Sequence, residues 1–201
     1  QFSQSEYFLT NFVSALSKLK IMIRILLLFA ALIGMNPLWS QETDTLPPVD
    51  EHTGLITYQE VVEQEGTPSK LFDRAVAWIN DYFPNPDNVI RDRNREEMEM
   101  RGIHRFKIKN TDEEGFETDA GVIQYDFRIE FKEGRYRYTL TDFALRQASK
   151  IPVEKWMDKE DPTYIPEWDS YLQQIDAFSK ELINSLKEGM KPTPEINDDD
   201  W

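Results

Sequence analysis

Arginine and lysine residues alternate with apolar residues in several segments of the chain. Side chains at every second position of an extended strand point to the same face of a sheet. We therefore expect one sheet face to gather basic side chains, opposed by few acids, chiefly Asp126 and Glu130. The basic residues expected on this face are Arg91, Arg93, Arg101, Arg105, Lys107, Lys109, Arg128, Lys132 and Arg137.

A basic face of this kind could bind an anionic glycan, lipid or protein. The alternative is that the long basic side chains only cover an exposed sheet and pair with glutamates on neighbouring strands. The residues that we select as a possible ligand face are Arg105, Lys107, Lys109, Arg128, Lys132 and Arg137.

Acidic residues cluster at 96–99 and at 112–119. Carboxylate oxygens are the ligands that calcium requires. The second cluster, however, lacks the Asp-x-Asp-x-Asp-Gly pattern with a glutamate at the twelfth position, so we interpret both clusters as solvated turns and predict no metal site. Nor does their spacing define a carboxylate pair suited to glycoside hydrolysis.

Few other residues could support catalysis. The chain has no cysteine and two histidines, which excludes disulfides, zinc–thiolate sites and thiol nucleophiles. His104 lies on the apolar side of its segment and is expected to be a hydrogen-bonded core residue rather than a base, while His52 lies in a polar stretch. No phosphate loop, nucleotide fingerprint or nucleophile elbow is present. We predict that the protein is not an enzyme and has no cofactor.

Aromatic residues punctuate a long connection at 146–166 and the residues just after it. A connection of this length is either functional or docked on its domain. Trp156, Tyr164 and Trp168 could therefore form a partner-binding loop, or they could attach the connection to the core, the reading that we favour.

Hydrophobic spacing predicts two helices. After Thr67, a natural N-cap followed by Pro68, apolar residues recur at three- and four-residue intervals up to Phe83. A second amphipathic helix is predicted over about 167–187, with Gly189 as its C-terminal stop.

Alternation predicts five strands, at 54–62, 89–93, 101–109, 121–132 and 135–145. The pair Glu133-Gly134 separates the last two and indicates a hairpin. Strict alternation is typical of antiparallel strands with one buried face. The predicted fold is therefore α+β, in the order β-α-β-β-β-β-α, with one antiparallel sheet and two helices packed on one face.

The start of the chain is predicted to be a targeting segment. Residues 22–40 combine a basic residue with eleven uncharged residues at 25–35, too few for a spanning helix but typical of a secretory signal peptide. Residues 1–21 are interpreted as an over-extended start or a long n-region. We predict a linker at 41–53, a domain at 54–189 and a disordered acidic tail at 190–201. The mature protein is expected to be periplasmic, in the outer envelope or extracellular, with no stable membrane span.

Overall charge limits the partners. The chain carries a net charge of −14, and residues 41–201 alone, with 36 acidic and 20 basic side chains, carry −16. A field of this sign opposes non-specific binding to nucleic acid or to anionic membranes. We predict no nucleic-acid partner.

Three segments also resemble a known family. The strand Ile56-Thr-Tyr58, the helix segment from Leu71 to Ile79 and the hairpin from Tyr125 to Thr139 are similar to secreted proteins of Bacteroidetes-type bacteria, the domain of unknown function 4468 family. The resemblance covers roughly residues 54–189. It implies a TBP-like fold and carries over no active-site residues.

The sequence thus predicts an exported, non-catalytic binding module of the cell envelope, with a basic sheet face as the possible site. Two alternatives remain open: a structural or accessory subunit of an envelope assembly, and a carboxylate-dependent hydrolase.

Overall fold

The computed structural model describes residues 46–192. The regular elements follow in the order β1 (Tyr58–Glu63), α2 (Pro68–Tyr82), α3 (Pro86–Val89), β2 (Ile90–Asn94), β3 (Glu99–Thr111), β4 (Glu117–Lys132), β5 (Arg135–Arg146), β6 (Lys150–Pro152), the 3₁₀ helix η1 (Val153–Met157) and α4 (Glu167–Gly189). The predicted order β-α-β-β-β-β-α is confirmed, with the short α3, β6 and η1 added to it.

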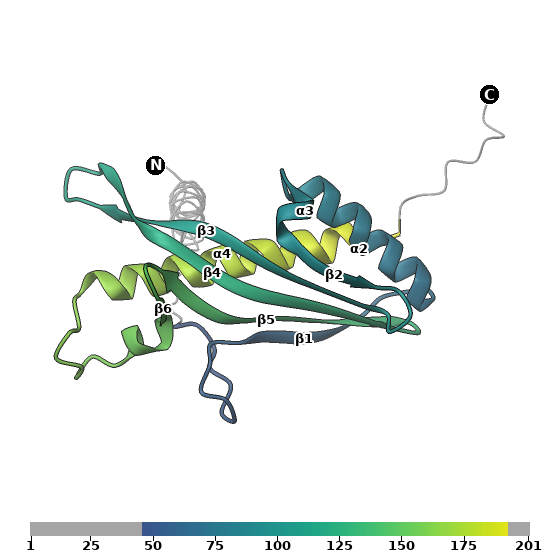
Figure 1. Ribbon diagram of the computed structural model, residues 1–201, viewed down its shortest axis with the longest axis horizontal. Coiled ribbons are helices and arrows are strands. Elements are labelled where there is room, and N and C mark those ends of the chain that lie inside the picture. Colours follow the sequence, from purple (N-terminus) through teal and green to yellow (C-terminus); the bar gives the residue numbers. More distant parts are fainter. Residues whose placement is uncertain (1–45, 193–201) are drawn as a thin grey trace, which may run out of the picture. The chain divides into compact units, whose positions relative to one another are not determined.

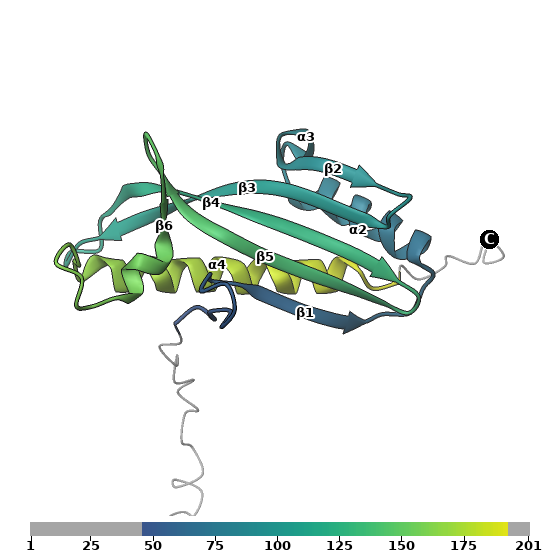
Figure 2. The same ribbon diagram turned by 60° about the horizontal axis from the view of Figure 1, so that its bottom comes forward.

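One antiparallel sheet of six strands forms the centre of the fold. Its strands run in the order β1-β5-β4-β3-β2, and β6 pairs with the end of β5. The long helices α2 and α4 lie behind the sheet, on the same face (Figure 1, Figure 2). This arrangement confirms the predicted α+β class with helices packed on one face of the sheet.

Local sequence explains the boundaries of α2. The Thr67 side chain accepts a hydrogen bond from the backbone N–H of Lys70, and Pro68 occupies the first turn. A cap of this kind satisfies one of the free N–H groups at a helix start. The buried residues Leu71, Phe72, Ala75, Trp78 and Ile79 then form the stripe that packs on the sheet.

Helix α4 ends differently from the prediction. Gly189 is its last helical residue rather than a residue beyond its end, and the cap at Met190 has ordinary right-handed backbone angles. A Cβ atom on Gly189 would lie 2.6 Å from Cδ1 of Trp78 on α2. The glycine therefore serves a close approach between the two helices, and the predicted stop signal was wrong for that reason.

The core lies between the sheet and the two long helices. Alternate residues of β4, from Ile123 to Phe131, are buried on this side, and Tyr136, Tyr138 and Leu140 of β5 lie beside them. The other residues of these strands face away from the helices. The alternation read from the sequence thus separates the two faces correctly.

The connection at 146–166 is docked on the domain. Residues Ala144 to Arg146 pair with β6, and η1 follows directly with Val153 and Trp156 buried. One carboxylate oxygen of Glu154 accepts a hydrogen bond of 2.9 Å from the backbone N–H of Ile56. These contacts make the connection part of the folded unit.

The described part of the predicted linker is also folded. Pro47 is buried, Val49 forms an isolated antiparallel bridge with Ile56, and the Asp50 carboxylate accepts hydrogen bonds from the turn that follows. From Pro47 onward this segment therefore packs on the domain instead of acting as a free connection.

The predicted signal peptide at 22–40, the segment 1–21 and all but the first three residues of the predicted tail at 190–201 lie outside the described residues. Across residues 46–192 the structure contains no helix long and apolar enough to cross a bilayer.

Candidate functional site

The face of the sheet opposite α2 and α4 contains a shallow hollow of about 430 Å³. We call it the arginine depression, because four guanidinium groups line it. The four are Arg91, Arg101, Arg128 and Arg137, and the other lining residues are Gln59, Gly102, Ile103, Asp126, Phe127, Glu130, Thr139 and Thr141. The lining comes from β1, β2, β3, β4 and β5, so a basic surface spans most of the sheet.

Register places these arginines side by side. Arg101 of β3 is the direct partner of Arg128 on β4, and Arg137 of β5 is the partner of Glu130 on β4. Paired residues in antiparallel strands project to the same face. The strand pairing therefore brings together side chains that are up to 36 residues apart in the chain.

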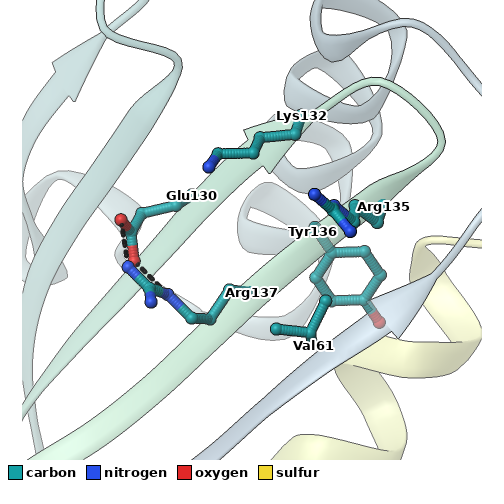
Figure 3. Close-up of a pocket in the computed structure, with 6 residues that line it drawn as sticks. All are labelled: Val61, Glu130, Lys132, Arg135, Tyr136 and Arg137. Carbon is teal, nitrogen blue, oxygen red and sulfur yellow. Dashed lines mark hydrogen bonds and ion pairs between the residues drawn. The ribbon is translucent and has the colours of Figure 1, made fainter.

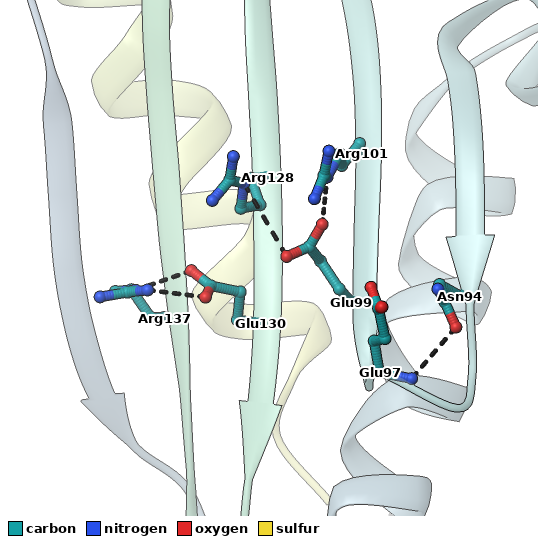
Figure 4. Close-up of polar contacts among 7 residues, drawn as sticks. All are labelled: Asn94, Glu97, Glu99, Arg101, Arg128, Glu130 and Arg137. Carbon is teal, nitrogen blue, oxygen red and sulfur yellow. Dashed lines mark hydrogen bonds and ion pairs between the residues drawn. The ribbon is translucent and has the colours of Figure 1, made fainter.

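Two acids hold three of the arginines in place. Glu99 of β3 pairs with Arg101 and lies 4.0 Å from Nε of Arg128. Glu130 accepts two hydrogen bonds from Arg137, of 2.7 Å from Nε and 2.6 Å from Nη2. Figure 4 shows these five side chains in a row across β3, β4 and β5. We call this row the ion-pair belt.

The pKa values within the ion-pair belt follow these contacts. The hydrogen bonds from Arg137 hold the pKa of Glu130 below its ordinary value. In return, the hydrogen bond to Glu130 raises the pKa of Arg137. Glu130 and Arg137 therefore both remain charged over a wide pH range.

The expectation that few acids oppose the basic residues is wrong. Glu99, Glu117 and Asp119 were interpreted as parts of solvated turns, but they lie within β3 and β4. Glu117 pairs with Lys109, and Asp119 lies 2.6 Å from Nζ of Lys107. The strands are longer than their apolar residues indicated, so their polar ends were assigned to loops.

On the open face of the sheet, Arg91 and Arg105 are among the arginines without a carboxylate partner within residues 46–192. Nε of Arg105 donates to the side-chain amide oxygen of Gln124 at 3.0 Å, and Arg91 makes a long hydrogen bond of 3.4 Å to the neighbouring carbonyl of Ile90. Burial lowers the pKa of Arg105, and the positive charges of Arg146 and Arg91 lower it further. Arg91, which lines the depression, thus belongs with Arg105 and Arg146 to a positive region that has no ion pair within residues 46–192.

The six residues selected from the sequence fall into three groups. Arg128 and Arg137 line the arginine depression, and Arg105 lies within electrostatic range of Arg91, one of its lining residues. Lys107 and Lys109 lie towards the β3–β4 hairpin, in ion pairs, and do not line it.

Lys132 lies at the opposite end, by the β4–β5 hairpin. There it lines a second hollow of about 220 Å³ with Val61, Arg135 and Arg137 (Figure 3). This hollow extends the basic surface towards the hairpin turn.

Arg93, also expected on the open face, does not lie there. It is the partner of Met100, whose side chain is buried in the core, so Arg93 lies on the helix side of the sheet. A register shift between Ile90 and Asp92 changes which residues of β2 face the helices. A β-bulge of this kind cannot be read from alternation alone.

The depression also contains neutral hydrogen-bonding groups that the sequence analysis did not select, and Asp126, which it expected on this face. Thr139 donates to the Gln59 amide oxygen at 3.1 Å, and the Thr141 hydroxyl lies 2.9 Å from that of Thr57. Burial and the nearby Asp142 raise the pKa of Asp126, whose Oδ1 has no hydrogen-bond partner within the described part of the chain. Outward alternation along β5 was the signal that could have identified the two threonines.

His104 lies on the other face of the sheet. Its Nδ1 is 3.2 Å from the Tyr125 hydroxyl, and its ring packs against Phe83 and Phe178. Burial lowers its pKa to about 4. This geometry agrees with the expected role as a core residue and keeps the imidazole away from the arginine depression.

The three aromatic residues of the possible partner loop lie together. Trp156 stacks on Trp168 with ring centroids 6.1 Å apart, and Tyr164 contacts Trp168 edge-on at 5.8 Å. Trp156 also packs against Tyr171 of α4. The loop is thus attached to α4, and its role as a partner surface stays a prediction.

The described part of the chain contains no candidate metal site: over residues 46–192, no group of three or more His, Cys, Asp or Glu side chains could hold a metal ion. Glu99, Glu117 and Asp119, three of the acids considered for calcium, are engaged by basic side chains instead.

Comparisons with known proteins agree with the fold. Residues 58–146 match a family model described as a domain of unknown function (DUF4468) with TBP-like fold. A TBP-like protein from Parabacteroides distasonis aligns with a TM-score of 0.58 and 15% identity, over 72% of this chain and 96% of that one. A DUF4468 family protein from Bacteroides ovatus aligns with a TM-score of 0.56 and 14% identity, over 74% and 91%. A search of curated proteins gave no significant match. The resemblance predicted from the sequence is confirmed.

Proposed function

Residues 58–146 match the model of the DUF4468 family with a TBP-like fold, and from this premise we propose that the protein is a non-catalytic module that binds an anionic glycan on the open face of its sheet. The fold itself assigns no activity, because one fold serves many functions. The proposal therefore depends on the chemistry of the arginine depression.

One observation carries the proposal: four arginines from β2, β3, β4 and β5 line a single hollow on a face that neither long helix covers. Guanidinium groups present a planar fork of donors that matches carboxylate and phosphate oxygens. Arg91, which has no carboxylate partner among the described residues, remains available to such a ligand.

Neutral groups in the same hollow favour a sugar over a lipid surface. Gln59, Thr139 and Thr141 line the β1–β5 side, whereas the Oδ1 atom of Asp126, which has no partner in the described range, is itself buried. A polyhydroxylated ligand can exchange hydrogen bonds with these groups, whereas a lipid headgroup layer meets mainly the basic side chains. Carboxylate-bearing sugars combine both requirements.

A binding role agrees better than hydrolysis with the acids of the hollow. Carboxylate-dependent glycosidases need two carboxyl groups that act as acid and as base or nucleophile. Glu130 is engaged by two hydrogen bonds from Arg137, which leaves Asp126 as the acid that lines the hollow without an arginine partner in residues 46–192.

Export is part of the proposal. The signal-like segment 22–40 supports secretion, and the net charge of −16 beyond it opposes non-specific adsorption to anionic polymers. Binding would therefore depend on the local basic surface. Deleting residues 22–40 is expected to retain the protein in the cytoplasm of a bacterial host, which fractionation would detect; periplasmic recovery of the deletion variant would contradict export through this segment.

The test of the binding site compares two double variants with the same change of charge. Arg91→Glu with Arg105→Glu alters one lining residue of the depression and its positively charged neighbour without removing an ion pair. Lys70→Glu with Arg93→Glu alters exposed residues of α2 and of the helix side of β2, and serves as the matched control.

Titration calorimetry with oligogalacturonate, with a neutral oligoglucan and with phosphatidylglycerol vesicles distinguishes the outcomes. We expect wild type and control to bind oligogalacturonate and not the neutral glycan, and the site variant to bind at least tenfold more weakly with unchanged thermal unfolding. Binding to vesicles alone would assign the face to lipid. Equal weakening in both variants, or no binding to either anionic probe, would refute the proposed function.

A further inference from the structure

Another cavity, of about 410 Å³, lies where the ends of β3, β4 and β5 meet β6, η1 and the start of α4. We call it the tryptophan pocket. Its apolar walls are formed mainly by Ile108, Leu145, Ile151, Trp156, Trp168 and Tyr171. Cavities of a few hundred Å³ with apolar and aromatic walls are the usual form of small-molecule sites.

The walls of the tryptophan pocket are not all closed from water. Ile165 is 42% exposed, and Leu145, Ile151 and Trp168 are only half-buried. Exposed apolar surface is unfavourable by about 25 cal/mol per Å², so a ligand that covers it gains free energy. An apolar ligand therefore gains more free energy in this pocket than it would on a flat face.

Several contacts fix the shape of the pocket. Trp156 is held between Trp168 and Tyr171, whose ring centroids lie 6.1 and 5.6 Å away. The Tyr171 hydroxyl donates to Asn110 on β3, and Glu154 in η1 binds the backbone of Ile56. Since sheet, 3₁₀ helix and α4 are tied together, the ligand would meet walls that are already in position.

Lys155 is the one charged side chain among those that line the pocket. It forms no ion pair within residues 46–192. Asp161 lies within electrostatic range, but its Oδ1 accepts hydrogen bonds of 2.7 Å from both the backbone N–H and the hydroxyl of Thr163. The ammonium group is thus available to an anionic group at the pocket.

We propose that the tryptophan pocket binds an amphipathic small molecule, with its apolar body against Trp156, Trp168 and Leu145 and a single carboxylate or similar anionic head at Lys155. The charge of Lys155 favours a monoanion over a neutral apolar molecule, while the apolar walls disfavour a hydrophilic anion. This site lies on the helix side of the sheet and does not depend on the proposed glycan site.

Two fluorescent probes separate the contribution of the Lys155 charge from that of the apolar walls. 1-Anilinonaphthalene-8-sulfonate has an aromatic body with an anionic head, and N-phenyl-1-naphthylamine is its neutral analogue. Excitation of tryptophan with detection of probe emission reports binding near Trp156 and Trp168. We expect the sulfonate to bind about tenfold more tightly than the amine, and dodecanoate to displace both.

Variants locate the site. Leu145→Trp and Ala120→Leu fill the pocket from different walls and should abolish energy transfer to both probes. If one of the two fails to fold, the variant that retains native-like cooperative unfolding decides the result. Lys155→Gln should weaken sulfonate binding about five- to tenfold and leave amine binding unchanged; Lys70→Gln, the remote control, should change neither.

Three results would overturn the proposal: unchanged sulfonate binding in a folded pocket-filling variant, equal affinity of wild type for the two probes, or no effect of Lys155→Gln. The double variant Arg91→Glu with Arg105→Glu should retain probe binding, so failure at the open face and failure at the tryptophan pocket give different patterns.

Discussion

The hydroxyl of Tyr58 donates a buried hydrogen bond of 2.9 Å to Oδ1 of Asp176 and so joins the edge strand β1 to the middle of α4. The second oxygen of Asp176 pairs with Lys180 one turn further along the helix. Burial and the carboxylate both raise the pKa of Tyr58 far above its ordinary value. The phenol therefore stays protonated, and remains a donor, well above neutral pH.

Tyr58→Phe should lower the free energy of unfolding by about 1–3 kcal/mol, because a buried carboxylate oxygen loses its donor. Urea titration measures the change. Tyr138→Phe is the matched control: it removes a hydroxyl on the same sheet face, but the partner Glu60 has a side chain that is 46% exposed, so the loss should be smaller. An equal or larger effect at Tyr138 would contradict the argument.

Gly189→Ala should destabilise the protein by about 1–3 kcal/mol, as expected for overpacking. Helix propensity alone predicts the opposite sign, since alanine is favoured over glycine by about 1 kcal/mol inside a helix. The added methyl group would meet the Trp78 ring, whose Nε1 donates to Ser185. Thermal unfolding of Gly189→Ala and of the double variant Gly189→Ala with Trp78→Phe tests this. If Gly189→Ala alone stabilised the protein, the two helices would move apart at little energetic cost, and the prediction would be wrong.

His104 should make stability depend on pH between about 6.5 and about 4, the ordinary and the folded pKa values of its imidazole. The unfolded chain binds a proton in this range that the folded protein does not, so the free energy of unfolding falls as the pH is lowered. His104→Gln, which retains a polar partner for Tyr125, should flatten this part of the profile. His52→Gln, in an exposed turn, is the control; equal profiles for both variants would contradict the assignment.

Glu99→Gln should strengthen anion binding at the arginine depression about two- to fivefold, because one negative charge beside Arg101 and Arg128 is removed. The same change should reduce stability by about 1 kcal/mol, the upper range for partly exposed ion pairs. Glu117→Gln removes an equal charge beside Lys109 and should leave oligogalacturonate binding unchanged. Calorimetry that gives the same affinity for both variants would argue against a local electrostatic effect.

Much of the architecture follows from local sequence. Thr67 and Pro68 define the start of α2, Gly134 lies in the hairpin turn, and the period of two along β4 and β5 identifies the buried face. These signals are strong because each depends on backbone geometry or on burial within one segment. The family resemblance added the TBP-like fold, and the family model agrees with it.

What the sequence could not predict depends on contacts between segments. Gly189 reads as a helix stop, yet it accommodates Trp78 from another helix. Arg93 reads as part of the open face, but a bulge in β2 turns it to the helix side. The ion pairs of Lys107 and Lys109 arise from strand ends that carry no hydrophobic signal. Periodicity determines the faces, whereas the partners of each charge depend on register.

The ion-pair belt has a thermodynamic consequence for recognition. Ordering a long arginine side chain on binding costs about 0.5–1.5 kcal/mol for each residue immobilised. Glu99 and Glu130 already restrain the three arginines of the belt in the free protein. A ligand that binds these guanidinium groups alongside the two carboxylates therefore meets side chains that have already lost part of their rotational entropy on folding. The carboxylates that reduce the net positive charge of the face thus also reduce the entropic barrier to its use.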